Sequence, residues 1–259
     1  MNVALTPDLP AGISTRNILG TAVSVLCQQD CIHYLDACLA GKVFTRVGFL
    51  NAHIANVAST DTRLRAIMPD FVVLADGVGV DLASRLLYGD KFPANLNGTD
   101  FIPAFLAAIK RPLHIGLIGA TPENAAKARQ AFSAAAPWHR FETISDGYFS
   151  ESAIPAILGT LEELHPDIVL VAMGVPRQEF FIADQLSPRH CTMSFAVGAL
   201  FDFMSGAVPR APLFMRQLRL EWLYRLWLEP GRLWRRYIVG NPAFIVRVLG
   251  QKLRQPGMR

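Results

Sequence analysis

Residues 71–80 read FVVLADGVGV, an apolar run that ends abruptly in Asp76 and a glycine. An unbroken run of Phe, Val and Leu is typical of a strand buried on both faces, and an Asp-Gly pair is typical of a turn. An unpaired carboxylate inside the core would cost several kcal/mol. We therefore expect Asp76 at the end of the strand, either as a plain turn residue or as part of a binding site.

The same arrangement recurs along the chain up to about residue 200. Apolar runs alternate with amphipathic segments of helical period, which favours parallel strands joined by helices. The expected strands are 45–51, 71–75, 113–119, 141–145, 167–174 and 192–198, and the expected helices are 53–67, 80–88, 100–109, 122–136, 152–164 and 177–185. This pattern predicts an α/β fold, with a Rossmann-like, mainly parallel sheet flanked by helices at 1–205.

The length and composition favour one large domain with an appendage, because 51% of the 259 residues are hydrophobic. No apolar run reaches 18 residues, so we expect no transmembrane helix. The N-terminus lacks a basic region followed by an apolar one, so we expect no export. Three of the four cysteines, Cys27, Cys31 and Cys38, lack zinc-site spacing and are expected to be reduced and buried, and we predict no bound metal.

Positive charge is concentrated at the C-terminal end. Residues 210–259 contain ten Arg, one Lys and two acidic residues, a net charge of +9, which leaves −5 for the rest of the chain. They also contain three of the four tryptophans. This composition favours a polyanionic partner, and Trp mixed with Arg favours amphipathic helices on an anionic membrane; the alternative is a helical hairpin packed on the core. We assign 206–259 to a helical appendage, broken at Pro230-Gly231 and Asn241-Pro242.

Small or polar residues follow most of the expected strands, at the edge where α/β sheets bind ligands. Asn51 and Asp76 follow the first two. Gly119 and Thr121 open a helix whose amides could hold a phosphate, or they form an ordinary turn. In LNGTDF (96–101), a glycine turn precedes Thr99 as a capping residue, or the segment is a plain loop into a helix.

Two further polar residues follow the last expected strands. Gln178 can hydrogen-bond sugar hydroxyls through its donor and acceptor groups, or it faces solvent. Asp202 caps a turn or binds the polar edge of a base.

The motifs ADG, GTDF, LIGATPE, DGYF, MGVPRQE, GALFDFMSG and LEWLYRL occur here in the order seen in the WecG/TagA/CpsF glycosyltransferases, which this chain resembles over about 50–240. The resemblance implies inverting, metal-independent transfer of a sugar, of glucose or N-acetylmannosamine type, from a UDP-sugar to a polyprenyl-diphosphate-linked saccharide. It implies no cofactor. The enzyme would act in surface polysaccharide synthesis at the cytoplasmic face of the inner membrane. Its basic appendage would dock on that anionic surface and help to close the active site.

The resemblance also implies roles for individual residues. Asp76 would be the catalytic base, Asn51 and Gln178 would line the sugar site, and Asp202 would contact the nucleotide. The residues that would further contact substrates are Asn97, Gly98, Thr99, Gly119 and Thr121, with Arg225, Arg232 and Arg235 on the donor diphosphate. One residue departs from the family pattern: Asn95 stands where an arginine is common, which suggests a different sugar or acceptor. Xanthan-type glucosyltransferases are one candidate by analogy.

Two other functions are compatible with parts of the sequence. An NAD(P)-dependent oxidoreductase would suit the core, but the sequence lacks GxGxxG and the acidic ribose partner that such enzymes carry at the second strand. A non-enzymatic adaptor at a membrane or nucleic acid would suit the basic tail, but it leaves the polar strand ends unexplained. We therefore expect no nucleic acid partner, and self-association is compatible with a mobile appendage.

Overall fold

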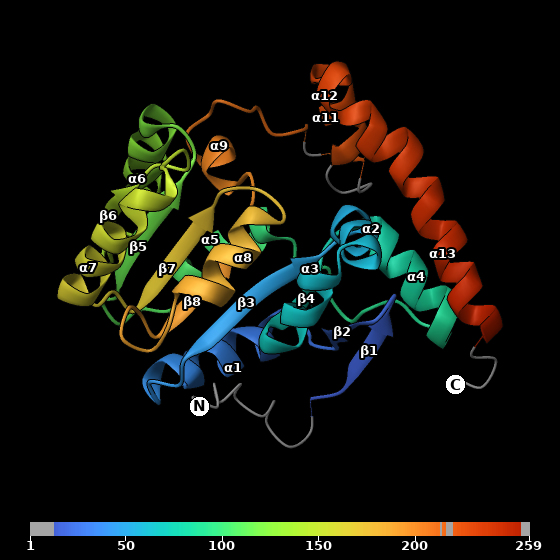
Figure 1. The fold of residues 1–259 in the computed structure, drawn as a ribbon, viewed down its shortest axis with the longest axis horizontal. Coiled ribbons are helices and arrows are strands. Elements are labelled where there is room, and N and C mark those ends of the chain that lie inside the picture. Colours follow the sequence, from blue (N-terminus) through green and yellow to red (C-terminus); the bar gives the residue numbers. More distant parts are fainter. Residues whose placement is uncertain (1–12, 213, 216–219, 255–259) are drawn as a thin grey trace.

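The fold is seen in a computed structural model that describes residues 13–212, 214–215 and 220–254 (Figure 1). Residues 1–12, in which no export signal is expected, lie outside the description. A six-stranded parallel sheet has the order β4-β3-β8-β7-β5-β6. Its strands are β3 (Thr45–Leu50), β4 (Val72–Ala75), β5 (His114–Gly119), β6 (Arg140–Ser145), β7 (Ile168–Ala172) and β8 (Met193–Ala196). The predicted α/β fold is confirmed.

The sheet separates two hydrophobic cores, because its central strands are apolar on both faces. On β7, Ile168, Leu170 and Ala172 point into one core. Val169 and Val171, which alternate with them, point into the other. Because both faces are buried, polar and apolar residues do not alternate along these strands, and helices must cover both sides of the sheet.

The helices divide between the two faces accordingly. The first core takes side chains from α1 (Gln28–Ala40), α5 (Gly98–Ala108), α6 (Pro122–Ala135) and α9 (Leu200–Met204). The second takes them from α2 (Ala52–Thr60), α4 (Gly77–Tyr88), α7 (Ile154–Leu164) and α8 (Arg177–Gln185), and from α3 (Thr62–Ile67). Two short 3₁₀ helices, η1 (Met68–Asp70) and η2 (Glu151–Ala153), complete the core.

Two local features differ from the sequence-based prediction. The expected helix 53–67 is broken at Asp61, whose backbone is extended and whose side chain caps α3 by accepting a hydrogen bond from the Leu64 amide. An antiparallel hairpin of β1 (Thr15–Ile18) and β2 (Thr21–Ser24) was not predicted. Its turn places Leu19 and Gly20 at positive φ, and a leucine there gives no turn signal in the sequence.

The appendage contains α11 (Glu221–Leu228), α12 (Pro230–Trp234), a π-helical turn η3 (Arg235–Val239) and α13 (Gly240–Arg254). Pro230 begins α12, so the predicted break there is confirmed. The predicted break at Asn241-Pro242 is wrong, because η3 runs into α13 without interruption and Pro242 lies inside this continuous helical segment. Among the described helices, none has both the length and the apolar character needed to cross a membrane.

Helix α13 lies along α2 and α4, on the outside of the sheet's second core (Figure 1). Phe244 and Val248 are fully buried there. The Asn56 side chain donates to the Gly240 carbonyl at 2.7 Å. At the far end, Gln251 accepts from the Leu19 amide of the hairpin at 2.9 Å. The C-terminal helix is therefore fixed to the core at both ends, while the division of the chain at 205/206 stays a prediction.

Replacing Gly119 with alanine should destabilise the fold. Gly119 ends β5 at a φ of +133°, and a Cβ there would lie 2.3 Å from the Ala172 carbonyl oxygen. We expect a loss of at least about 2 kcal/mol in the free energy of unfolding, from strain and overlap. Gly159 in α7 is the control, since its Cβ would meet nothing within 4 Å, and Gly159→Ala should stabilise by about 0.5–1 kcal/mol. Urea denaturation of both variants measures this, and equal stabilities would contradict the steric argument.

Candidate active site

A cavity of about 360 Å³ lies over the carboxyl ends of the strands; we call it the strand-end cavity. The turn after every strand of the sheet contributes to its wall. These turns supply Asn51 after β3, Asp76 after β4, Ala120 and Thr121 after β5, Gly147 and Tyr148 after β6, Gly174 after β7 and Gly198 after β8. The predicted clustering of polar strand ends at one edge is thus seen in the structure.

A second cavity of about 360 Å³, the appendage cavity, lies between the core and the appendage. Its core side comes from α4 and from the segment before α5. Its other side is lined by Trp222, Tyr237, Phe244 and Ile245. The residues that line both cavities are Asn51, His53, Asp76, Thr99, Phe203, Arg225 and Arg236. Asp76 therefore lies where the two cavities meet.

The orientation of Asp76 is set by two asparagines. Asn51 caps α2, because its Oδ1 accepts from the amides of His53 and Ile54, both at 3.1 Å. This leaves its Nδ2 to donate to Asp76 Oδ2 at 3.0 Å. Asp76 occupies the N-cap position of α4 but does not cap it. Asn95 binds there instead, accepting from the Gly77 amide at 2.9 Å, so the carboxylate faces the cavities.

The environment of Asp76 makes its carboxylate more basic than that of an ordinary aspartate. Burial raises its pKa, and Glu221 adds to the effect. The hydrogen bond from Asn51 and the charges of Arg236 and Arg225 act in the opposite direction. A raised carboxyl pKa in a cavity is typical of a general base.

Arginines of the appendage gather opposite the strand ends. Arg225 and Arg236 line both cavities, and Arg232 lines the strand-end cavity. Arg235 is not brought to either cavity: it is exposed, and its guanidinium lies 5.4 Å from the Trp234 ring centre. The sequence motif placed the third arginine at 235, whereas the helix presents its neighbour Arg236 to the site.

The guanidinium groups of Arg225 and Arg236 are partly desolvated, whereas Arg232 is 61% exposed and forms an ion pair with Glu229 at 2.6 Å. Burial lowers the pKa of Arg236, and the charges of Arg225 and Arg232 lower it further. The buried Nε atoms of Arg225 and Arg236 have no hydrogen-bond acceptor among the described residues. Clustered, desolvated cations favour an anionic ligand that supplies both charge and acceptors.

Four predicted residues come from the starts of α5 and α6. Asn97 caps α5 by accepting from the Asp100 amide at 3.0 Å, so the prediction that Thr99 is the cap is wrong. Thr99 lies in the first turn and lines both cavities, whereas Gly98 lines the strand-end cavity only. Thr121 caps α6, as predicted.

The remaining predicted residues differ in how they reach the strand-end cavity. Gly119 lies behind the cavity and lines neither wall. Asp202 lines it and accepts from Asn124 at 2.9 Å. Gln178 is only 1% exposed, so the solvent-facing alternative is wrong. It lines the cavity, and its side chain ties α8 to the turn after β8, accepting from the Gly198 amide at 3.0 Å and donating to the neighbouring Glu179 at 2.8 Å.

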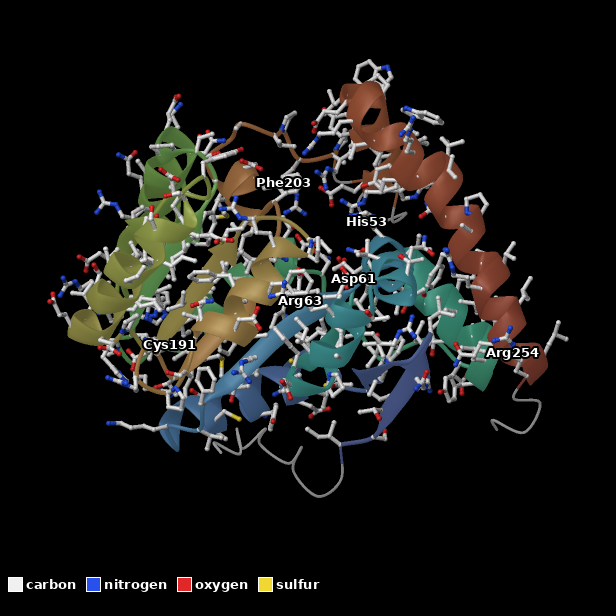
Figure 2. All side chains as sticks on the ribbon, in the orientation of Figure 1. His53, Asp61, Arg63, Cys191, Phe203 and Arg254 are labelled. Atoms are coloured by element: carbon white, nitrogen blue, oxygen red, sulfur yellow. The ribbon has the colours of Figure 1, made fainter. Side chains whose placement is uncertain are left out.

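Besides Arg236, two further residues that line both cavities were not predicted from the sequence. His53 lines both cavities, and burial together with Arg236 lowers its pKa to about 4, so its ring is neutral at pH 7. Phe203 lies within 5.1 Å of the Arg225 guanidinium. Figure 2 shows both side chains in the space between the strand ends and the appendage. In the described part of the chain, no group of three or more His, Cys, Asp or Glu residues is placed to hold a metal ion.

The fold and site define an α/β enzyme with one basic carboxylate and an arginine-rich site for an anionic ligand. Comparison with known proteins gives the family. The sequence matches the Glycosyl transferase WecG/TagA/CpsF family over residues 16–257, so the chain belongs to this family. The resemblance seen in its motifs is confirmed.

Two curated relatives carry the same name, N-acetylglucosaminyldiphosphoundecaprenol N-acetyl-beta-D-mannosaminyltransferase. The chain is 32% identical to the protein from Bacillus subtilis (strain 168) over 224 residues, which cover 85% of this chain and 83% of the relative. It is 31% identical to that from Bacillus spizizenii (strain ATCC 23059 / NRRL B-14472 / W23) over 202 residues, or 77% and 76% of the two chains.

Glu179, buried behind Gln178, should make stability depend on pH. Burial raises its pKa from 4.5 to about 7. Between these values the folded state holds a proton that the unfolded state has released, so stability falls as pH rises through this window. The loss amounts to about 3 kcal/mol. Glu179→Gln should remove this part of the pH dependence, measured as the difference in unfolding free energy between pH 4.5 and pH 8. Parallel curves for the two proteins would contradict the assignment.

Proposed function

We propose that this chain transfers a sugar from a UDP-sugar to a saccharide linked to polyprenyl diphosphate. The observation that carries the proposal is the position of Asp76 at the junction of two cavities, one rich in arginine and one partly apolar. Two substrates could meet at this carboxylate from different sides. Family membership and the names of the relatives support the same activity.

The donor would bind in the strand-end cavity. Arg225, Arg232 and Arg236 suit its diphosphate, because a planar guanidinium binds phosphate oxygens in pairs and stays charged. The amides at the start of α6, after Thr121, add a partial positive charge. Asp202, at the same wall, is suited to accept hydrogen bonds from the uridine. The arginine cluster thus stabilises the negative charge that grows on the leaving UDP.

The reaction would be an inverting displacement at C1 of the donor sugar. An acceptor hydroxyl attacks C1 while the bond from C1 to the diphosphate oxygen breaks on the opposite face. Asp76 takes the hydroxyl proton, and UDP leaves with the bonding electrons. Asn51 holds the carboxylate in place, since its own amide is fixed by the cap of α2. In this scheme the chain's own residues supply the base and the countercharge.

The appendage would place the enzyme on the cytoplasmic face of the membrane as a peripheral protein. Trp227, Val246 and Leu253 are highly exposed for apolar residues, with Leu253 at 82%. They accompany arginines on the same helices. Exposed apolar and basic side chains together favour binding to an anionic bilayer.

The departure at Asn95 concerns the acceptor more directly than the donor. Asn95 lines the appendage cavity and not the strand-end cavity, and it bonds to both backbone groups of Gly77. We infer that this chain differs from family members with arginine there in its acceptor. N-acetylmannosamine is then the first donor sugar to test, as the relatives' names suggest, and glucose, the xanthan-type alternative, is the second.

Asp76→Asn should lower kcat by about 10²–10⁴-fold, because the amide cannot take the proton. UDP binding should change little. In the wild type, kcat/KM should fall on acidification at a higher pH than an ordinary aspartate would give, since burial raises the Asp76 pKa and only the carboxylate is active. Initial rates against pH and a UDP titration measure both effects. An Asn variant with normal turnover would refute the base.

The structure and the motif pattern differ on which arginine completes the site, and two variants can decide between them. Arg236→Ala should lower kcat/KM by about 10²-fold or more through lost stabilisation of the leaving diphosphate. Arg235→Ala, the matched control, should change it less than about fivefold, because the side chain is exposed. The assay uses a detergent-solubilised acceptor, which removes effects of membrane binding. A greater loss from Arg235→Ala would reverse the assignment.

A further inference from the structure

Two exposed apolar residues stand at the mouth of the appendage cavity. Val78 and Leu82 of α4 are 45% and 43% exposed, and both line the cavity. They lie four residues apart, so they share one face of the helix. Nothing in the donor scheme uses them, because neither lines the strand-end cavity.

The opposite wall of this cavity is also apolar. Tyr237 of η3 and Phe244 and Ile245 of α13 line it. Gly79 of α4 packs closely on both α2 and α13, because a Cβ there would lie 3.2 Å from Ala52 Cβ and 3.6 Å from the Phe244 ring. All three residues line the cavity, so the close contact between these helices forms part of its wall.

The character of the cavity changes from its inner end to its mouth. The inner end, shared with the strand-end cavity, holds Asp76, His53, Arg225 and Arg236. The mouth holds aliphatic side chains. A ligand with a charged, hydrogen-bonding head and a hydrocarbon tail matches this gradient, because each part meets groups of its own polarity.

The apolar wall continues from the mouth along α13. Ile245 lines the cavity, and Leu249 lies one turn further along the same side of the helix and is 44% exposed. Ile238, seven residues before Ile245, is also exposed. Figure 1 shows α13 running beside α4 toward the far end of the core. The cavity mouth thus adjoins the apolar surface that we assign to the membrane.

We propose that Val78 and Leu82, together with Ile245, bind the first isoprene units of the polyprenyl acceptor. This inference rests on the proposed function. The diphosphate and saccharide would lie inward, with the attacking hydroxyl near Asp76, and the chain would leave between α4 and α13 into the bilayer. The acceptor would then enter sideways from the membrane, while the donor reaches the strand-end cavity.

The test compares two acceptors that share one saccharide-diphosphate head. One carries a long polyprenyl chain, and the other carries a short alkyl chain that cannot reach past the cavity mouth. The full-length protein carries Leu82→Gln or Val78→Ser. Two control variants are Leu253→Gln, which alters the exposed surface of α13 away from the cavity, and Val43→Ser, which alters an exposed valine just before the amino end of β3, whereas the cavities lie at the carboxyl ends of the strands.

We expect each mouth variant to lower kcat/KM for the long-chain acceptor by about tenfold, from lost apolar contact. For the short-chain acceptor, kcat/KM should stay within about twofold of wild type. Leu253→Gln should lower membrane binding in a vesicle flotation assay without changing the ratio of the two acceptors in detergent. Val43→Ser should change neither membrane binding nor the ratio of kcat/KM for the two acceptors. Thermal melting and the shift produced by UDP establish that each variant is folded.

Several results would overturn the inference. Equal losses with both acceptors would mean that Val78 and Leu82 serve the head group or the fold. Unchanged values with both would remove them from the acceptor site. A change in self-association on size-exclusion chromatography, without a change in chain-length preference, would assign this face to a protein contact. Wild-type protein that binds UDP but turns over neither acceptor would instead overturn the proposed function itself.

Discussion

The hydrogen bond from Asn51 to Asp76 is the interaction on which the site depends. It joins the ends of β3 and β4. Asn51 can only donate to Asp76 through Nδ2, because its Oδ1 already accepts hydrogen bonds that cap α2. Asn95 takes over the cap of α4 that Asp76 would otherwise form. The backbone amides at the starts of α2 and α4 are thereby hydrogen-bonded to asparagines and not to the carboxylate. The carboxylate of Asp76 is therefore not used in a helix cap and faces the cavities, and burial raises its pKa.

Much of the fold could be predicted because burial dictates it. Strands such as β7 and β8, apolar on both faces, can only lie inside a sheet covered by helices on both sides. The polar residues that follow such strands then fall at one edge by topology alone. For this reason Asn51, Asp76, Thr121, Gln178 and Asp202 were all found at one cavity. Predicting which strands are parallel and buried was therefore enough to predict that these five residues lie close together.

The features that could not be predicted depend on which face of a helix a residue occupies, or on contacts between residues far apart in the sequence. The π-helical turn η3 contains Arg235 and Arg236 and adds one residue to a helical turn. No pattern in the sequence predicts it. His53 lines both cavities, and its ring is neutral because burial and the distant-in-sequence Arg236 lower its pKa. Asn95 and Asn97 cap helices from loop positions whose conformation depends on the packed core. Each of these is a property of the assembled structure.

The contact between Gln251 and the N-terminal hairpin has a consequence for how the enzyme can vary. Gln251 binds the backbone of Asn17 and Leu19, more than 230 positions away in the chain. Helix α13, which this contact anchors, is continuous with the turn that carries Arg236. The hairpin therefore holds one end of a helical segment whose other end carries Arg236. In a relative with a different turn at 19–20, this segment, and with it Arg236, would be held differently against the core although no residue lining either cavity had changed.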